Sequence, residues 1–222
     1  MTSSSSQRFS DEPNQLNEWL WVFSPNKNSF STTSWWLDCG TEPVLIDCPA
    51  LTSSNLSTLK KLSEGKTPKI ILTNRKAHSS VSELKEALGC KVLIQEQEAY
   101  LLPQLNGLET FQDEINTVSG LKLLWTPGPT PGSCIVFAPE PWNVLFCGRL
   151  LIPVKFGELA SIRHETTFHW AMQQKSLTKL RDWLPREANP QLASGANLSL
   201  LMPEVLLKWE AWKYITDDHK TK

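Results

Sequence analysis

Short apolar runs that end in polar or glycine-containing loops recur along this chain, and amphipathic helical patterns separate several of them. Residues 18–23, 34–40 and 42–49 are rich in aromatic and β-branched side chains with turn residues between them, which predicts an antiparallel meander. Later, the runs KIILTN and CKVLIQ flank the helical pattern VSELKEALG. A strand, a helix and a strand in that order predict a parallel crossover, so the chain reads as an α/β domain.

Helical spacing of apolar residues recurs in three other segments, at 51–65, 166–185 and 203–215. In the first, Ser53 or Ser54 is expected to cap the start of the helix and Gly65 to end it. In the second, Phe168 is counted among the apolar positions that face the core. Further strands are expected at 121–128 and 133–148.

Length and composition fit one soluble domain. The 222 residues are 40% hydrophobic, and we expect a disordered polar tail at 1–17, one domain at 18–216 and a polar tail at 217–222. A formal net charge of −1 gives no electrostatic basis for binding nucleic acid. No apolar run is long enough to span a bilayer. The five cysteines form no CxxC pair, so we expect reduced thiols in the cytoplasm or an equivalent reducing compartment.

Four segments together carry a family pattern. WTPGPTPGSCIVF at 125–137 repeats Thr-Pro-Gly before an apolar run, and VLFCGRLLI at 144–152 is a strand that ends at a glycine. IILTNRKAHSS at 70–80 and QLASGANL at 191–198 are the other two. One Thr-Pro-Gly turn would mean little, but four ordered matches in strand-and-loop context resemble the metallo-β-lactamase fold. The resemblance covers roughly residues 18–200 and implies a four-layer αββα sandwich.

Hydrolases of this family hold one or two metal ions with His and Asp side chains on these loops, and a metal-bound hydroxide attacks the substrate. In the first loop, the family's three His positions are Asn74, Lys76 and Ser79 in this chain, and its Asp position is His78. The His of the TPGHTPG turn is Pro129, the Asp after Phe-x-Gly is Arg149, and the final His is Ala196. Only His78 could still bind a metal, so the resemblance implies no metal, no other cofactor and no catalytic residue here.

The turn residues of the same motifs are kept, including Gly128 and Gly132, which indicates a retained fold without the family's reaction. We therefore expect a non-catalytic pseudoenzyme that acts as a protein-binding scaffold or an assembly or regulatory factor. Its protein partner is unknown, and peripheral association with a complex fits this role. One alternative is a binder of an anionic or phosphorylated small molecule through Arg75, Lys76, His78 and Arg149. An enzyme with altered chemistry is the third interpretation.

Lys76 and Arg149 would share the place of two dications. Two like charges about 5 Å apart at an effective dielectric near 20 repel by roughly 3 kcal/mol. Either a nearby acid, with Asp47 and Glu165 as candidates, or a bound anion should offset this repulsion. A plugged pocket whose charges are solvated or form salt bridges is the preferred interpretation.

Three further features have simple interpretations. The segment RHETTFH lacks the second histidine of an HExxH motif, so His164 and His169 are expected to be polar or capping residues. Cys147 is expected to pack in the core rather than act as a nucleophile. Most of the ten tryptophans should be buried, and exposed ones would mark a surface that meets a partner.

Overall fold

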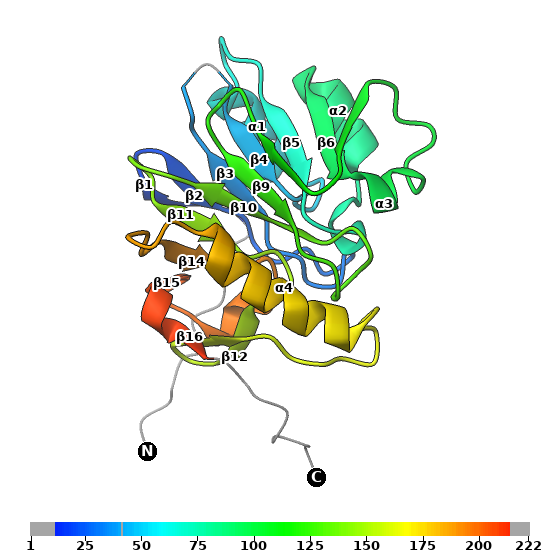
Figure 1. Cartoon of the computed structure of the whole chain (residues 1–222). Helices are drawn as coiled ribbons and strands as arrows, with labels where there is room; N and C mark the ends of the chain where they lie inside the picture. The colour runs from blue at the N-terminus through cyan, green and yellow to red at the C-terminus, as the bar shows by residue number, and fades with distance from the viewer. Residues whose placement is uncertain (1–11, 41, 214–222) are drawn as a thin grey trace.

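Two β-sheets face each other in the computed structural model, which describes residues 12–40 and 42–213 (Figure 1). The first sheet has the strand order β1-β2-β3-β4-β5-β6-β7. Its strands are β1 (Asn14–Asn17), β2 (Leu20–Val22), β3 (Trp35–Leu37), β4 (Val44–Ile46), β5 (Lys69–Leu72), β6 (Lys91–Gln95) and β7 (Leu108–Phe111). Strands β1 to β4 pair antiparallel, as the meander predicted, whereas β4 to β7 pair parallel because a helix returns the chain between neighbours.

The second sheet has the strand order β15-β14-β11-β10-β9-β8. Its strands are β8 (Glu114–Asn116), β9 (Lys122–Trp125), β10 (Cys134–Ala138), β11 (Val144–Phe146), β14 (Gln191–Ala193) and β15 (Leu206–Leu207). Only the β11–β14 pair is parallel. A small third sheet contains β12 (Ile152–Lys155), β13 (Glu158–Ala160) and β16 (Trp212–Lys213).

The helices lie outside the two large sheets. They are α1 (Ser53–Leu62), α2 (Val81–Leu88), α3 (Glu96–Ala99) and α4 (Trp170–Trp183), with 3-10 turns η1 (Arg75–Ala77), η2 (Leu198–Leu200) and η3 (Trp209–Ala211). The N-cap of α1 is Thr52, one residue before the predicted caps, and its side chain accepts from the amide of Asn55. Within the described part of the chain, no helix is both long enough and apolar enough to cross a membrane.

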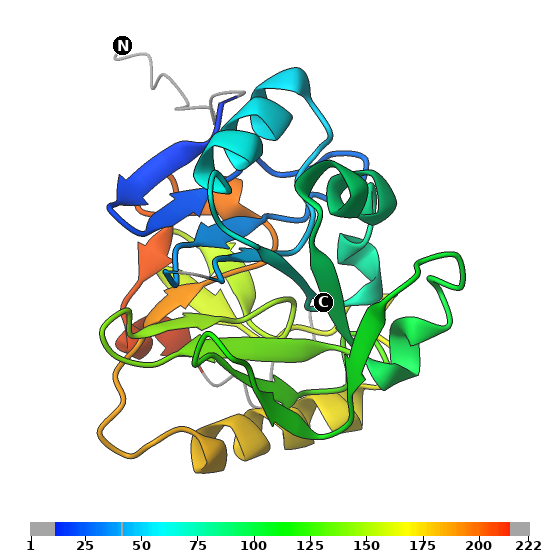
Figure 2. The same ribbon diagram turned by 90° about the horizontal axis from the view of Figure 1, so that it is seen from above.

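Four layers follow from this arrangement, with α1 and α2 on the outer face of the first sheet and α4 on the outer face of the second (Figure 2). Leu59 of α1 and Leu84 of α2 belong to the buried cluster that covers the outer face of β4 to β6. Leu177 and Leu180 of α4 join the larger cluster, which also fills the space between the sheets. The predicted αββα sandwich is confirmed.

The ends of the domain differ from the prediction. Strand β1 lies inside the segment 1–17 assigned to a tail, and it pairs with β2. The helix predicted at 203–215 is wrong: β15 pairs with β14, and β16 pairs with β13. A short apolar stretch suits either structure, and two sheet edges here supply backbone partners that a helix would leave unpaired. Residues 1–11 and 214–222, which include the rest of both predicted tails, lie outside the described residues.

Candidate functional site

Four loops carry the positions matched to metal ligands at one edge of the sandwich. Asn74 to Ser79 follow β5 and contain η1, Pro129 lies between β9 and β10, Arg149 follows β11, and Ala196 follows β14. The last two loops touch closely, because the amide of Gly195 donates to the carbonyl of Gly148 at 2.9 Å. A β-carbon at Gly195 would lie 2.8 Å from that carbonyl oxygen, so only glycine permits this approach.

A segment of the β2–β3 connection, residues 26–33, fills the space above the first of these loops. The side-chain amide of Asn26 donates to Ser79 Oγ at 3.0 Å. The hydroxyls of Ser29 and Thr32 both donate to the main-chain carbonyl of Lys76, the second at 3.2 Å. Two of the matched positions, Lys76 and Ser79, therefore accept hydrogen bonds from this segment. We call residues 26–33 the clasp.

Arg149 binds the same clasp from the other half of the domain. Its Nη2 donates to the carbonyl of Phe30 at 2.6 Å and lies 3.2 Å from Thr32 Oγ1, to which it also donates. Thr32 also forms an isolated β-bridge with Ala196. The clasp thus joins the loops that follow β5, β11 and β14 by hydrogen bonds.

A cavity of about 30 Å³ remains beside the clasp. It is lined by Lys76, Pro129, Arg149, Ile152, Ile162, His164, Thr166, Thr167 and Gln173. Two of the four predicted anion-binding residues, Lys76 and Arg149, therefore share one cavity, whereas the other two do not line it. Arg75 instead pairs with the buried carboxylate of Glu98, with Nε 3.1 Å from Oε1. His78 caps the end of η1.

The two cations in this cavity lack a direct carboxylate partner. No ion pair between described residues includes Lys76 or Arg149. Lys76 Nζ donates to Thr166 Oγ1 at 2.7 Å and lies 5.2 Å from the centre of the Phe30 ring. Burial, together with the charges of Arg149 and Arg75, lowers the pKa of Lys76. A lowered pKa of Lys76 is the direction that repulsion by a neighbouring cation produces.

Asp47 is the acid that comes nearest to offsetting this charge. Its buried carboxylate accepts from the amide of Thr73 and from Thr73 Oγ1, both at 2.7 Å. Burial raises the pKa of Asp47 to about 7, while Thr73 and Arg149 act in the opposite direction. Burial likewise lowers the pKa of Arg149, which the charge of Asp47 partly restores. The other predicted acid, Glu165, forms no ion pair with either cation and is not among the charges that shift the pKa of Lys76 or Arg149.

The residues at the former ligand positions do not fit a metal cluster. The side chain of Asn74 is already engaged, since Oδ1 accepts from the amide of Lys76 at 3.0 Å and Nδ2 donates to Thr73 Oγ1 at 2.9 Å. Pro129 and Ala196 have no donor atom, and Arg149 brings a positive charge. Among the described residues, no three or more His, Cys, Asp or Glu side chains gather where they could hold a metal ion.

The Thr-Pro-Gly turn positions α4 beside the cavity. Gly128 has a φ of +138°, and its carbonyl accepts from the amide of His169 at 3.0 Å. His169 is the N-cap of α4, and its Nδ1 accepts from the amide of Met172 at 3.2 Å, which confirms the capping role. The helix therefore starts at Trp170, later than predicted, and Phe168 is exposed rather than facing the core.

Several residues of this site were missed in the sequence. The cavity is also lined by Thr166, Thr167 and Gln173. The two threonines lie in the RHETTFH segment, where the sequence suggested only a zinc-binding motif that lacks its second histidine. Exposed tryptophans were expected to mark a partner surface, yet no tryptophan whose side chain is described is exposed, and the exposed aromatic residues near the cavity are Phe30 and Phe168. Apart from Trp170, each tryptophan with a described side chain belongs to or packs against one of the two buried clusters.

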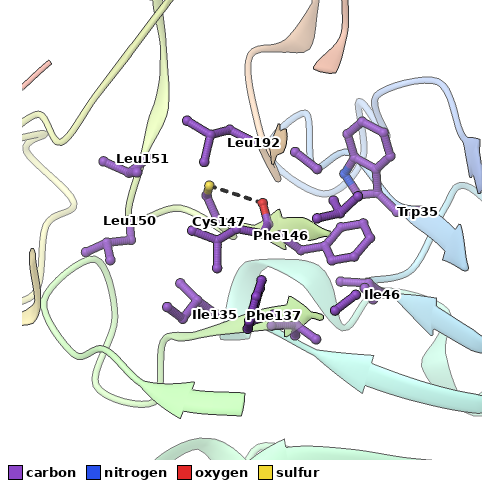
Figure 3. Packing of buried hydrophobic residues seen from close by; sticks show 14 of the residues in the cluster. Trp35, Ile46, Ile135, Phe137, Phe146, Cys147, Leu150, Leu151 and Leu192 are labelled. Atoms are coloured by element: carbon purple, nitrogen blue, oxygen red, sulfur yellow. Dashed lines mark hydrogen bonds between the residues drawn. The ribbon is translucent and has the colours of Figure 1, made fainter. Parts of the chain in front are cut away.

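Cys147 lies in the core and not in the cavity. It is fully buried among Leu150, Leu151 and Leu192, and its thiol donates to the carbonyl of Leu145 at 3.4 Å (Figure 3). Burial raises its pKa well above the ordinary value, so the reactive thiolate is disfavoured. The predicted packing role is confirmed.

Comparison with known proteins supplies structural relatives only. No protein-family model matches the chain, and no curated protein sequence is similar to it at a significant level. The crystal structure of VMB-1 superposes with a TM-score of 0.69 at 16% identity, covering 91% of this chain and 94% of that one. The B3 metallo-β-lactamase BLEG-1 gives 0.59 at 20% identity, covering 85% of this chain and 93% of that one. TTHA1623, in a di-iron-bound form, gives 0.61 at 21% identity, covering 79% and 92% respectively. The chain therefore has the metallo-β-lactamase fold.

Proposed function

We propose that this chain is a non-catalytic protein of the metallo-β-lactamase fold, which acts by binding. One observation carries the proposal: four of the seven former ligand positions, Lys76, Ser79, Arg149 and Ala196, contact the clasp. A hydrolytic centre of this kind needs several aimed donors and an open coordination position. Here the matched loops are joined by hydrogen bonds to the clasp, and only a cavity of about 30 Å³ remains between Lys76, Pro129 and Arg149.

The structural relatives argue against this proposal in one respect, since they are hydrolases or metal-bound proteins by their names. Their identity to this chain is 21% or less in the cases above, which leaves room for a different activity on the same fold. The proposal rests on the residues of this chain and not on those names.

Metal content tests the proposal directly. Protein purified from cells supplied with zinc, iron and manganese is expected to contain far less than one metal ion per chain by elemental analysis. An active metallo-β-lactamase purified in the same way is the positive control. About one metal ion per chain, lost in a His78→Ala variant, would contradict the proposal, as would hydrolysis of a β-lactam that a chelator abolishes.

A protein partner is the form of binding that we propose first. Phe30 in the clasp is 67% exposed and Phe168, next to the cavity residue Thr167, is 54% exposed, and exposed aromatic side chains often anchor protein interfaces. A partner recovered by wild type should be lost with the Phe30→Ser, Phe168→Ser double variant. Val118→Ser, which changes a 91% exposed residue in the β8–β9 turn, should retain it. Equal recovery with all three proteins would exclude this surface.

A further inference from the structure

We propose that Lys76, Arg149 and Thr166 form an oxyanion site, which takes the phosphoryl or carboxylate end of a ligand carrying an apolar body. The inference rests on the proposed binding function and names the chemistry of its site. Lys76 and Arg149 line one cavity, and no described carboxylate pairs with either of them. Two cations without a carboxylate ion-pair partner, in a partly buried place where Asp47 offsets only part of the charge of Arg149, favour a bound anion.

Unused hydrogen-bond donors support this assignment. Arg149 Nε is buried and has no hydrogen-bond partner, whereas Nη2 is committed to the clasp. Leaving a buried charged donor unpaired costs free energy, which an acceptor that reaches this guanidinium would recover. Thr166 adds a hydroxyl 2.7 Å from Lys76 Nζ, and the exposed side chain of His164 stands in the same wall.

The size of the cavity limits what can enter. About 30 Å³ holds roughly two water-sized groups. One or two oxygen atoms of an oxyanion fit, but a whole organic ligand does not. The remainder of the ligand would therefore lie outside, at the surface where Lys76 and Thr166 reach solvent.

The surface at that opening is aromatic. The Phe30 ring faces Lys76 Nζ, and Phe168 follows the cavity residue Thr167 and donates its amide to the carbonyl of Pro129 at 3.4 Å. Phe30 and Ser31 have φ values of +51° and +52°, a left-handed conformation that is strained for residues other than glycine. The chain thus holds an exposed ring beside the cation at a conformational cost. An aromatic or other apolar group attached to the anion would bury both rings.

The test compares three probes at matched ionic strength: inorganic phosphate, acetate and phenyl phosphate, with chloride as the reference anion. Binding is measured by calorimetry and by the melting temperature. Wild type should bind phosphate and phenyl phosphate, and phenyl phosphate should bind more tightly. Lys76→Met should weaken phosphate binding at least about tenfold, since it removes one charge-assisted contact. Lys61→Met, which changes an exposed lysine of α1, should bind as wild type does.

Each other result overturns the inference. Absence of binding by wild type to all three probes, or equal binding by the wild type and both lysine variants, excludes the site. Equal affinity for phosphate and phenyl phosphate excludes the role given to the two phenylalanines. Measurements on chelator-treated protein separate this inference from the proposed function. Failure of the metal-free protein to bind anions contradicts only the oxyanion site, whereas anion binding that requires a metal contradicts both.

Discussion

At the scale of single residues, two cations, Lys76 and Arg149, line one cavity without a carboxylate that forms an ion pair with either of them. Arg149 now occupies the place between the loops and depends on Asp47 for partial compensation, although the two form no direct ion pair. Asp47 is held by two hydrogen bonds from Thr73 in a fully buried position. Its protonation state therefore couples the stability of the protein to pH.

Asp47 should make the folded protein less stable as pH rises from about 4 to about 7. Burial raises the pKa of Asp47 from 3.8 to about 7, so the folded state keeps a proton that the unfolded chain releases in this range. Below about 4 both states are protonated, and above about 7 both are ionised. The free energy of unfolding should therefore fall by up to about 1.4 kcal/mol per pH unit between these limits through this group.

Urea unfolding at a series of pH values measures this slope. Asp47→Asn keeps the shape of the side chain and should remove the contribution, while Asp182→Asn on the exposed face of α4 should leave it unchanged. An unaltered slope in Asp47→Asn would show that another group titrates.

At the scale of elements, the Thr-Pro-Gly turn between strands β9 and β10 packs against helix α4. Ser176 donates its hydroxyl to the carbonyl of Pro127 at 2.7 Å, and His169 donates its amide to the carbonyl of Gly128. Backbone of the turn and backbone of the helix approach so closely that a side chain at position 128 has no room. Retention of this motif is thus explained by packing alone, without a metal.

Gly128→Ala should lower the free energy of unfolding by about 3 kcal/mol or more. The added carbon would lie 2.3 Å from Gln173 Cβ and 2.4 Å from its Cα, at a φ of +138° that other residues rarely adopt. Gly107→Ala is the matched control, since its φ of +69° is strained but its surroundings are open. It should cost about 1 kcal/mol. Similar losses in urea unfolding for both variants would argue that the turn is not packed on α4.

At the scale of the whole molecule, the clasp connects the two halves of the sandwich. It belongs to the first sheet by position, between β2 and β3, yet it binds loops that follow β11 and β14 in the second. Thr33 adds a backbone bond from its amide to the carbonyl of Gly195 at 2.9 Å. Hydrogen bonds within the protein thus serve as a cross-link between the sheets.

Arg149→Met should loosen the clasp without unfolding the domain. Methionine retains an apolar stem but loses the donors to Phe30 and Thr32, so we expect a loss of about 1.5–3 kcal/mol in stability. Hydrogen exchange at the amides of Thr32 and Thr33 should accelerate, while exchange in β5 and β6 should change little. The exposed Arg163→Met is the control. Unchanged exchange at both clasp amides would mean that Arg149 does not hold them.

The sandwich and the gathering of Lys76 with Arg149 could be predicted because each motif is a local pattern of strand, turn and glycine. The clasp could not. Asn26 and Ser79 are 53 positions apart, and nothing in the polar stretch around Asn26 indicates its partner. Arg75 was assigned to the anion site, but its pairing with Glu98 depends on where α3 packs. Contacts between distant side chains depend on the assembled layers, which local periodicity does not describe.

The long sequence separation within the clasp also bears on the order of folding. Arg149 and Thr32 are 117 positions apart, so their contact closes a large loop and costs chain entropy that only prior assembly of both sheets offsets. The clasp should therefore close late, after the rate-limiting step. Changes to it should speed unfolding and leave the refolding rate nearly unaltered.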